Sequence, residues 1–156
     1  MLAKIAISTF KKVTGMQWDI TLDDEYIINP NRIKELKTVN TTGSQFKYLF
    51  DPEDDRGDYA YVISTATVAS LVSAADDEPN SSFIALNVFE DDDTTDSVVA
   101  TYFRVEDISF AIAYGNYSWV YVAQGGSRMK RVLVYHNLDA ILNLANTGTT
   151  TTWLLS

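Results

Sequence analysis

The chain has no cysteine, one histidine, three prolines and seven glycines among its 156 residues. The absence of cysteine excludes disulfide frameworks, thiolate zinc sites and cysteine nucleophiles. Basic residues are also scarce, because 12 Lys and Arg stand against 21 Asp and Glu and give a net charge of −9. Phosphate contacts need clustered cations, so this charge balance makes a nucleic-acid partner the less favoured expectation.

Long apolar runs are missing as well. No segment approaches the roughly 18 consecutive apolar residues that a membrane helix requires, and we expect no membrane association. Residues 1–12 do not resemble a signal peptide, because lysines fall within and after a short alternating apolar stretch. Three Asn-x-Ser/Thr sequences, at Asn40, Asn80 and Asn116, are interpreted as chance matches. A cytosolic location is therefore the default expectation.

The pattern that dominates the chain is that of β-strands. Apolar residues make up 46% of the sequence, enough for a core. Alternating apolar and polar positions, rich in β-branched and aromatic residues, are separated by turn residues. They predict strands at residues 4–10, 16–22, 32–39, 45–50, 58–64, 82–89, 97–104, 108–114, 117–123 and 129–135. The acidic run at residues 23–25 is expected to begin a loop.

Two segments change to a helical period. Thr67 and Asn137 are typical N-cap residues, and each is followed by apolar residues at positions i, i+3, i+4 and i+7. These are Val68, Leu71, Val72 and Ala75 in the first segment, and Leu138, Ile141, Leu142 and Ala145 in the second. The spacing predicts short amphipathic helices at about 67–76 and 137–146.

The two helical segments lie 70 residues apart, and similar strand patterns precede them. We therefore predict an α+β, mostly β protein made of two similar antiparallel units, each with the order β-β-β-β-β-α. The units span residues 1–78 and 80–148, and residues 149–156 form a C-terminal tail. Units this small are marginal alone, so one compact body is expected. The alternative is a single β-sandwich that carries two helices.

No group of residues predicts catalysis. His136 stands at a strand end without a Gly-x-Ser-x-Gly nucleophile sequence, and we interpret it as a structural imidazole beside a helix cap. The Arg56-Gly57-Asp58 tripeptide spells an integrin-recognition sequence but is interpreted as ordinary turn chemistry. We predict a non-enzymatic protein with no catalytic residue and no cofactor.

Acidic residues gather in four clusters, at residues 23–25, 53–55, 76–78 and 90–93. Loop carboxylates suit calcium, which takes about six to eight oxygen ligands. None of the clusters fits an EF-hand loop, although Asp91, Asp93 and Asp96 come nearest to the alternation. The clusters are interpreted as solvated charge, and no metal site is predicted.

Aromatic residues are dense on the predicted strands, and sheet aromatics with nearby cations can stack single-stranded bases. The available cations are Lys47, Arg128, Lys130 and Arg131. Repeated units of strands followed by a helix resemble, in element order, the single-strand-binding proteins of the Pur-alpha or Whirly type. This resemblance implies the alternative function, binding of single-stranded nucleic acid by an aromatic sheet face. Core packing of the aromatics is the simpler interpretation.

The C-terminus ends in the apolar residues Trp153, Leu154 and Leu155. Large apolar side chains at a chain end need a place to be buried, either in the chain's own sheet or on a neighbouring subunit. These three residues are therefore the candidate partner contacts.

Taken as a whole, a small, cysteine-free, acidic chain rich in Thr, Asn, Asp and Tyr resembles the minor structural proteins of tailed bacteriophage virions. The resemblance implies a capsid decoration, auxiliary or head–tail protein. Its partners would be copies of itself or a larger protein assembly, in the virion or in the host cytoplasm during assembly.

Overall fold

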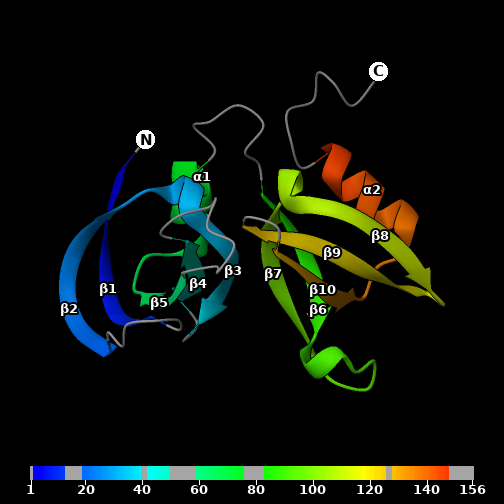
Figure 1. Cartoon of the computed structure of the whole chain (residues 1–156), viewed down its shortest axis with the longest axis horizontal. Helices are drawn as coiled ribbons and strands as arrows, with labels where there is room; N and C mark the ends of the chain where they lie inside the picture. Colours follow the sequence, from blue (N-terminus) through cyan, green and yellow to red (C-terminus); the bar gives the residue numbers. More distant parts are fainter. Residues whose placement is uncertain are drawn as a thin grey trace.

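The computed structural model describes residues 2–12, 19–39, 42–49, 59–75, 83–125 and 128–147. Within these residues, ten strands form one antiparallel sheet, accompanied by two α-helices (Figure 1). The prediction of a mostly β, α+β protein is confirmed. The strands belong to one sheet rather than to the two facing sheets of the sandwich alternative.

The elements follow the same order in each half of the chain. The first half contains β1 (Ala3–Lys12), β2 (Asp19–Ile28), β3 (Ile33–Val39), β4 (Gly43–Leu49), β5 (Tyr59–Ser64) and α1 (Val68–Ala75). The second contains β6 (Phe83–Phe89), β7 (Val98–Arg104), β8 (Ile108–Tyr114), β9 (Tyr117–Gly125), β10 (Arg128–Val134) and α2 (Leu138–Thr147). Short 3₁₀ turns are η1 (Pro30–Arg32), η2 (Glu90–Asp92) and η3 (Val105–Asp107).

Both helices lie where the sequence predicts them, and both begin at the predicted caps. The Thr67 Oγ1 accepts a hydrogen bond from the Ser70 backbone N–H at 3.1 Å. The Asn137 Oδ1 accepts from the Ala140 N–H at 2.8 Å. Each cap satisfies a backbone donor that the first helical turn leaves without a partner.

The loop predicted at residues 23–25 is wrong, because β2 continues through this acidic run to Ile28. Asp24 lies opposite Ile7 and Glu25 opposite Ala6 in the ladder with β1. Glu25 also forms an exposed ion pair with Lys4 at 3.1 Å. Backbone pairing with β1 thus overrides the low strand propensity of the acidic residues.

The order of strands across the sheet is β2-β1-β5-β4-β3-β7-β6-β10-β9-β8. Each half therefore arranges its own strands in the same way, as second, first, fifth, fourth and third. The halves meet where β3 pairs with β7, with Leu36 opposite Tyr102 and Lys37 opposite Thr101.

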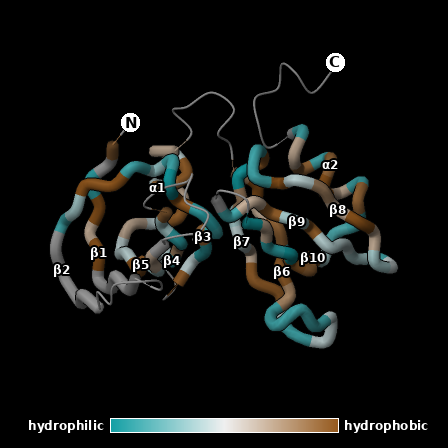
Figure 2. The backbone as a smooth tube through the Cα atoms, in the orientation of Figure 1, coloured by the Kyte–Doolittle hydropathy of each residue, from teal (hydrophilic) through white to brown (hydrophobic). Residues whose placement is uncertain are grey.

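Two hydrophobic clusters lie on opposite faces of this sheet. The first gathers around α1 and includes Phe83, whereas the second gathers around α2 and includes Ile84 and Leu86. Neighbouring residues of a strand point to opposite faces, so α1 and α2 cover opposite faces of the sheet. Figure 2 shows hydrophobic stretches along the inner strands of both halves and a hydrophilic turn between β6 and β7.

Arg104 holds the two halves together from a position that is only 2% exposed. Its guanidinium donates hydrogen bonds to the Ile33 carbonyl at 3.3 Å and to the Pro30 carbonyl. The same group lies 4.5 Å from the centre of the Phe83 ring. A buried charge is tolerated only when its donors are satisfied, so these contacts fix η1 against the end of β7.

Replacing Arg104 with Met keeps most of the side-chain volume but removes the donors to both carbonyls. We expect the free energy of unfolding to fall by about 2–3 kcal/mol, the cost of buried polar groups left without partners. Urea denaturation followed by circular dichroism measures it. The matched control is Arg131→Met, because Arg131 is exposed and lies 4.0 Å from the Trp119 ring centre. The control should lose no more than about 1 kcal/mol, and equal losses in both variants would contradict the role of Arg104.

Candidate assembly edge and junction pocket

Among the described strands, β8 pairs only with β9 and β2 pairs only with β1, so these two strands form the outer edges of the sheet. The β8 sequence, Ile-Ser-Phe-Ala-Ile-Ala-Tyr, contains neither a charged residue nor proline. Sheet proteins commonly protect their edges with charges, proline or bulges. β8 lacks the first two of these devices, and its pairing with β9 is irregular only between Ile108 and Phe110. No described strand pairs with its other side, so its backbone groups there can accept an incoming strand.

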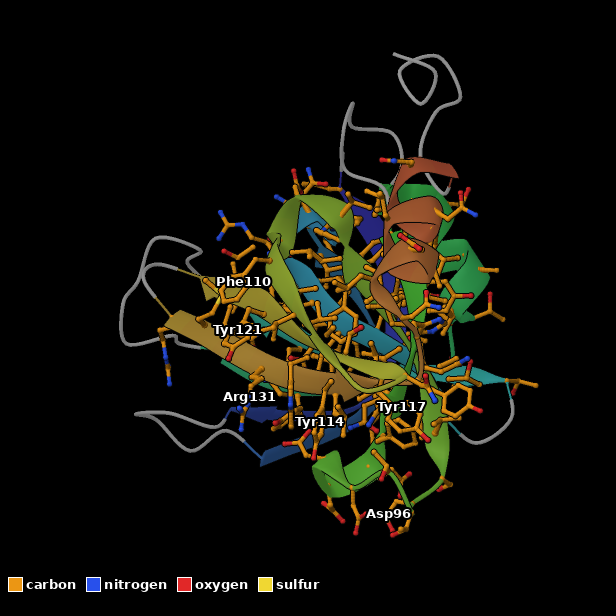
Figure 3. All side chains as sticks on the ribbon, turned by 90° about the vertical axis from the view of Figure 1, so that its right-hand side faces the viewer. Asp96, Phe110, Tyr114, Tyr117, Tyr121 and Arg131 are labelled. Carbon is orange, nitrogen blue, oxygen red and sulfur yellow. The ribbon has the colours of Figure 1, made fainter. Side chains whose placement is uncertain are left out.

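One face of β8 also exposes a row of large apolar side chains. Phe110, Ile112 and Tyr114 are each 53% exposed, and alternate residues of a strand share a face. Phe110 stacks on Tyr121 of β9 (Figure 3) at 4.2 Å between ring centres. Tyr114 stacks on Trp119 at 6.0 Å. Stacking orders the rings without covering them, and such exposed apolar surface is typical of interaction sites.

The opposite face of β8 borders an open groove of about 390 Å³ between this strand and α2. We call it the edge groove. It is lined mainly by apolar side chains, among them Val105, Ile108, Ala111, Leu138 and Leu142. Leu142 is 59% exposed although it occupies one of the apolar positions that predicted the helix.

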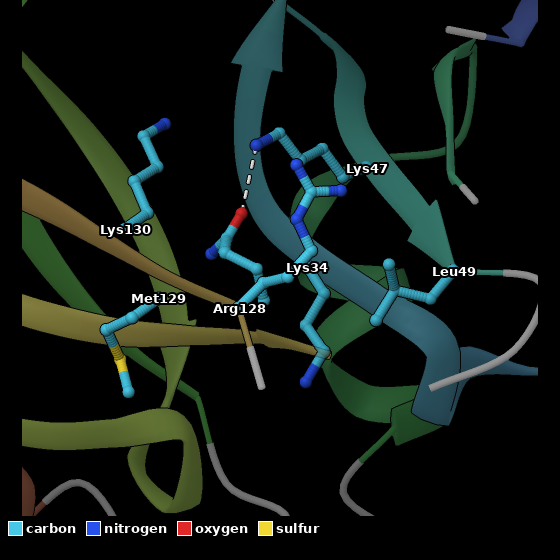
Figure 4. A pocket seen from close by; sticks show the side chains of 7 residues that line it. Lys34, Lys47, Leu49, Arg128, Met129 and Lys130 are labelled. Atoms are coloured by element: carbon cyan, nitrogen blue, oxygen red, sulfur yellow. Dashed lines mark hydrogen bonds between the residues drawn. The ribbon is translucent and has the colours of Figure 1, made fainter. Parts of the chain in front are cut away.

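A second candidate site, the junction pocket, lies where the halves meet and has a volume of about 190 Å³ (Figure 4). Its lining includes four cations, Lys34, Lys47, Arg128 and Lys130. Three of these are cations predicted from the sequence. Lys34 was not predicted, because only the pairing of β3 with the second half brings it beside β10. Arg131, the fourth predicted cation, lies instead over Trp119.

Two carboxylates partly neutralise the junction pocket. Asp107 pairs with Lys34 at 2.5 Å, and Glu35 contacts Lys130 at 3.2 Å and Lys47 at 3.5 Å. The Lys47 Nζ also donates to the Gln124 Oε1 at 3.0 Å. Burial lowers the pKa of Lys47, and Glu35 opposes this effect by favouring its charged form.

The backbone conformation of β3 determines where the Glu35 side chain lies. Glu35 has a φ of 50° and lies within an irregularity of the β3–β4 pairing, between Lys34 and Lys37. Among the described residues, the junction pocket brings four cations and two carboxylates together within an acidic protein. Such a pocket suits a small anion or a phosphate group.

His136 has a structural role consistent with the predicted imidazole beside a cap. Its Nε2 accepts a hydrogen bond from the Asn87 backbone N–H at 3.0 Å, and its carbonyl accepts from the Ser118 hydroxyl at 2.8 Å. Burial lowers the pKa of His136. The hydrogen bond to Nε2 requires the neutral ring, which favours the same direction.

The β6–β7 turn carries the acidic residues that came nearest to a calcium pattern. Asp93 accepts hydrogen bonds from the Thr95 N–H at 2.9 Å and hydroxyl at 2.8 Å, and these bonds lower its pKa. Asp96 lies at the tip of the same exposed turn (Figure 3). Within the described segments, no three His, Asp or Glu side chains come together as a metal site would need.

Several predicted features lie outside the described residues: Asn40, Asn80, residues 53–58 with the Arg56-Gly57-Asp58 tripeptide, residues 76–78, and the tail with Trp153, Leu154 and Leu155. Asn116 lies exposed in the β8–β9 turn.

No family model, curated protein or solved structure matches the chain. Neither helix in the described parts of the chain is long and apolar enough to cross a membrane.

The lowered pKa of His136 predicts how stability depends on pH. The unfolded chain binds the proton near the ordinary pKa of 6.5, but the folded chain binds it only at lower pH. The free energy of unfolding should therefore fall as the pH drops below that value, and level off once the folded protein is also protonated. Urea denaturation between about pH 5.5 and 7 isolates this effect, since the chain has one histidine. His136→Gln should flatten the dependence, and an unchanged slope would contradict it.

Proposed function

We propose that this protein is a non-enzymatic structural subunit that works by assembling with copies of itself or with a larger protein assembly. The observation that carries the proposal is β8, an edge strand without charge or proline whose apolar side chains are about half exposed. In a monomer such an edge is a liability, because it templates pairing with other chains. As an assembly surface it supplies main-chain hydrogen bonds and apolar contact together.

The assembly we favour is a tailed bacteriophage virion, with this chain as a capsid decoration, auxiliary or head–tail protein. Support comes from composition and from the assembly edge. The net charge of −9 keeps free subunits soluble and limits unwanted association, while the contacts are left to the apolar edge.

We also propose that the two halves are copies of one β-β-β-β-β-α unit. Equivalent residue pairs in the ladders support this. Lys37 opposite Gln45 corresponds to Ile112 opposite Trp119, at the same place in the third and fourth strands of each half. Likewise, Ser44 opposite Ser64 corresponds to Ser118 opposite Val134. Shared strand order with matching register is the expected mark of a duplicated unit.

Deleting residues 153–156 tests the proposal. We expect the deletion to weaken self-association in sedimentation velocity while the circular dichroism spectrum and the thermal midpoint stay close to those of the full chain. The reason is that three large apolar side chains would lose their contact on a neighbouring subunit. If the shortened chain unfolds instead, the tail belongs to the core and the contact is internal.

The junction pocket favours a second candidate function, binding of single-stranded nucleic acid. Lys47, Arg128 and Lys130 converge there, and Arg131 lies on an aromatic sheet face beside Trp119. Cations that follow a backbone, together with stacking rings, are the elements of sequence-independent strand binding.

Fluorescence anisotropy with a labelled single-stranded oligonucleotide tests this candidate. Binding should weaken steeply as salt rises, and Arg128→Gln combined with Lys130→Gln should reduce the salt dependence. The exposed Lys4→Gln is the control for loss of charge. Absence of binding at about 50 mM salt would remove the candidate.

A further inference from the structure

The ladder pairs of the two halves match, so each residue of an edge strand has an equivalent position, its counterpart, in the other half. Since Lys37 corresponds to Ile112, the outer edge strand β8 is the counterpart of β3. The other outer edge, β2, is the counterpart of β7, because Ala3 opposite Ile28 matches Ile84 opposite Phe103. The internal junction pairs β3 with β7. The two outer edges of the described sheet are therefore the counterparts of two strands that already pair.

The counterpart of the edge groove is filled in the first half. There Ile33, Leu36 and Leu71 are at most 1% exposed. Phe83 and Tyr102, which come from the second half, belong to or pack against this cluster. The groove beside α1 is thus closed by side chains that the neighbouring unit contributes across the strand pairing.

The residues that would close the edge groove in the same way are exposed on the opposite edge. The matching register makes Leu2 the counterpart of Phe83, and Ile27 the counterpart of Tyr102. Leu2 is 64% exposed and Ile27 is 70% exposed, which are the two highest values among the large hydrophobic residues described. An apolar groove lies at one edge of the sheet and two uncovered apolar side chains lie at the other.

We propose that β8 of one copy pairs antiparallel with β2 of a second copy, and that Leu2 and Ile27 of the second copy fill the edge groove of the first. By correspondence with the internal junction, Ala111 lies opposite Ile27 of the second copy, and Ile112 opposite its Tyr26. This inference rests on the proposed assembly function and on the matching halves, and it names the partner as a second copy of this chain.

The proposed contact is head to tail, because it joins two different surfaces. A head-to-tail contact leaves one β8 and one β2 free at the ends, so association continues past the dimer unless the rotation closes a ring. The contact is also mainly apolar, since the counterpart of Arg104 is Asn29 and that of Lys34 is Ser109. Acidic copies repel each other, so higher salt should strengthen association.

Two single-edge variants test the inference in sedimentation velocity over a concentration series. Ile112→Lys places a charge on β8, and Ile27→Lys places one on β2. Each should weaken self-association by about tenfold or more, since a charge on an edge strand opposes pairing. Val98→Lys is the matched control, because it adds the same charge at an exposed apolar residue away from both edges.

Mixing the two variants gives the decisive measurement. Each retains one intact edge, so an equimolar mixture should form a one-to-one dimer and nothing larger. If Ile27→Lys alone still associates as the wild type does, β8 pairs with something other than β2. That result overturns the inference and leaves the proposed function standing. A wild-type chain that stays monomeric throughout overturns both.

The chain's own C-terminal residues are the competing occupant of the edge groove. Leu142→Lys separates the two cases, because Leu142 lines the groove. Filling by a second copy predicts weaker association with an unchanged thermal midpoint. A lower thermal midpoint with unchanged association means that the tail fills the groove, and this overturns the inference.

Discussion

The constraint on which this structure depends is that the backbone groups of an edge strand need partners. Five strands with one helix leave two edges, and in this chain one edge of each half is used on the other half. The β3–β7 pairing joins ten strands into one sheet and places the helices on opposite faces. It also allows Phe83 to reach the first cluster while its neighbour Ile84 serves the second. The same pairing creates the junction pocket, because it brings Lys130 of the second half to the Glu35 carboxylate that Lys47 of the first half also contacts.

Local features were predictable from the sequence because their signals are local. The caps at Thr67 and Asn137 and the apolar spacing that follows them predicted both helices, and alternation predicted most strands. The acidic end of β2 was not predictable in this way, because pairing with β1 decides it. The partner of β3 was hidden for the same reason. Nothing near Lys34 in sequence indicates Asp107, yet the two side chains meet at 2.5 Å.

Charge in this protein is distributed unevenly over the described residues. The acidic excess lies in part on the exposed β6–β7 turn, where hydrogen bonds from Thr95 stabilise the ionised form of Asp93. Four of the twelve Lys and Arg line the pocket at the junction between the halves, where each of Lys34, Lys47 and Lys130 has a carboxylate in reach. Composition alone predicted an acidic surface and argued against a cationic site. The fold brings four of the cations together, so the net charge was a poor guide to the local charge.

The β3–β7 pairing within the chain and the proposed β8–β2 pairing between copies differ in the kind of contact that stabilises them. The internal junction is fixed by the buried Arg104, which donates to two carbonyls of the first half, and by two lysine–carboxylate pairs that cross it, Lys34–Asp107 and Lys130–Glu35, and such polar contacts are costly to break singly. At the outer edge the corresponding positions are occupied by Asn29, Ser109 and Phe110, which offer no buried charge. Apolar contacts and backbone hydrogen bonds would remain at this edge. These contacts can form and break without the desolvation of a charged side chain. If both pairings descend from the same pair of strands, buried polar contacts would be kept at the junction within the chain. Apolar contacts would be kept at the edge that pairs reversibly with a second copy.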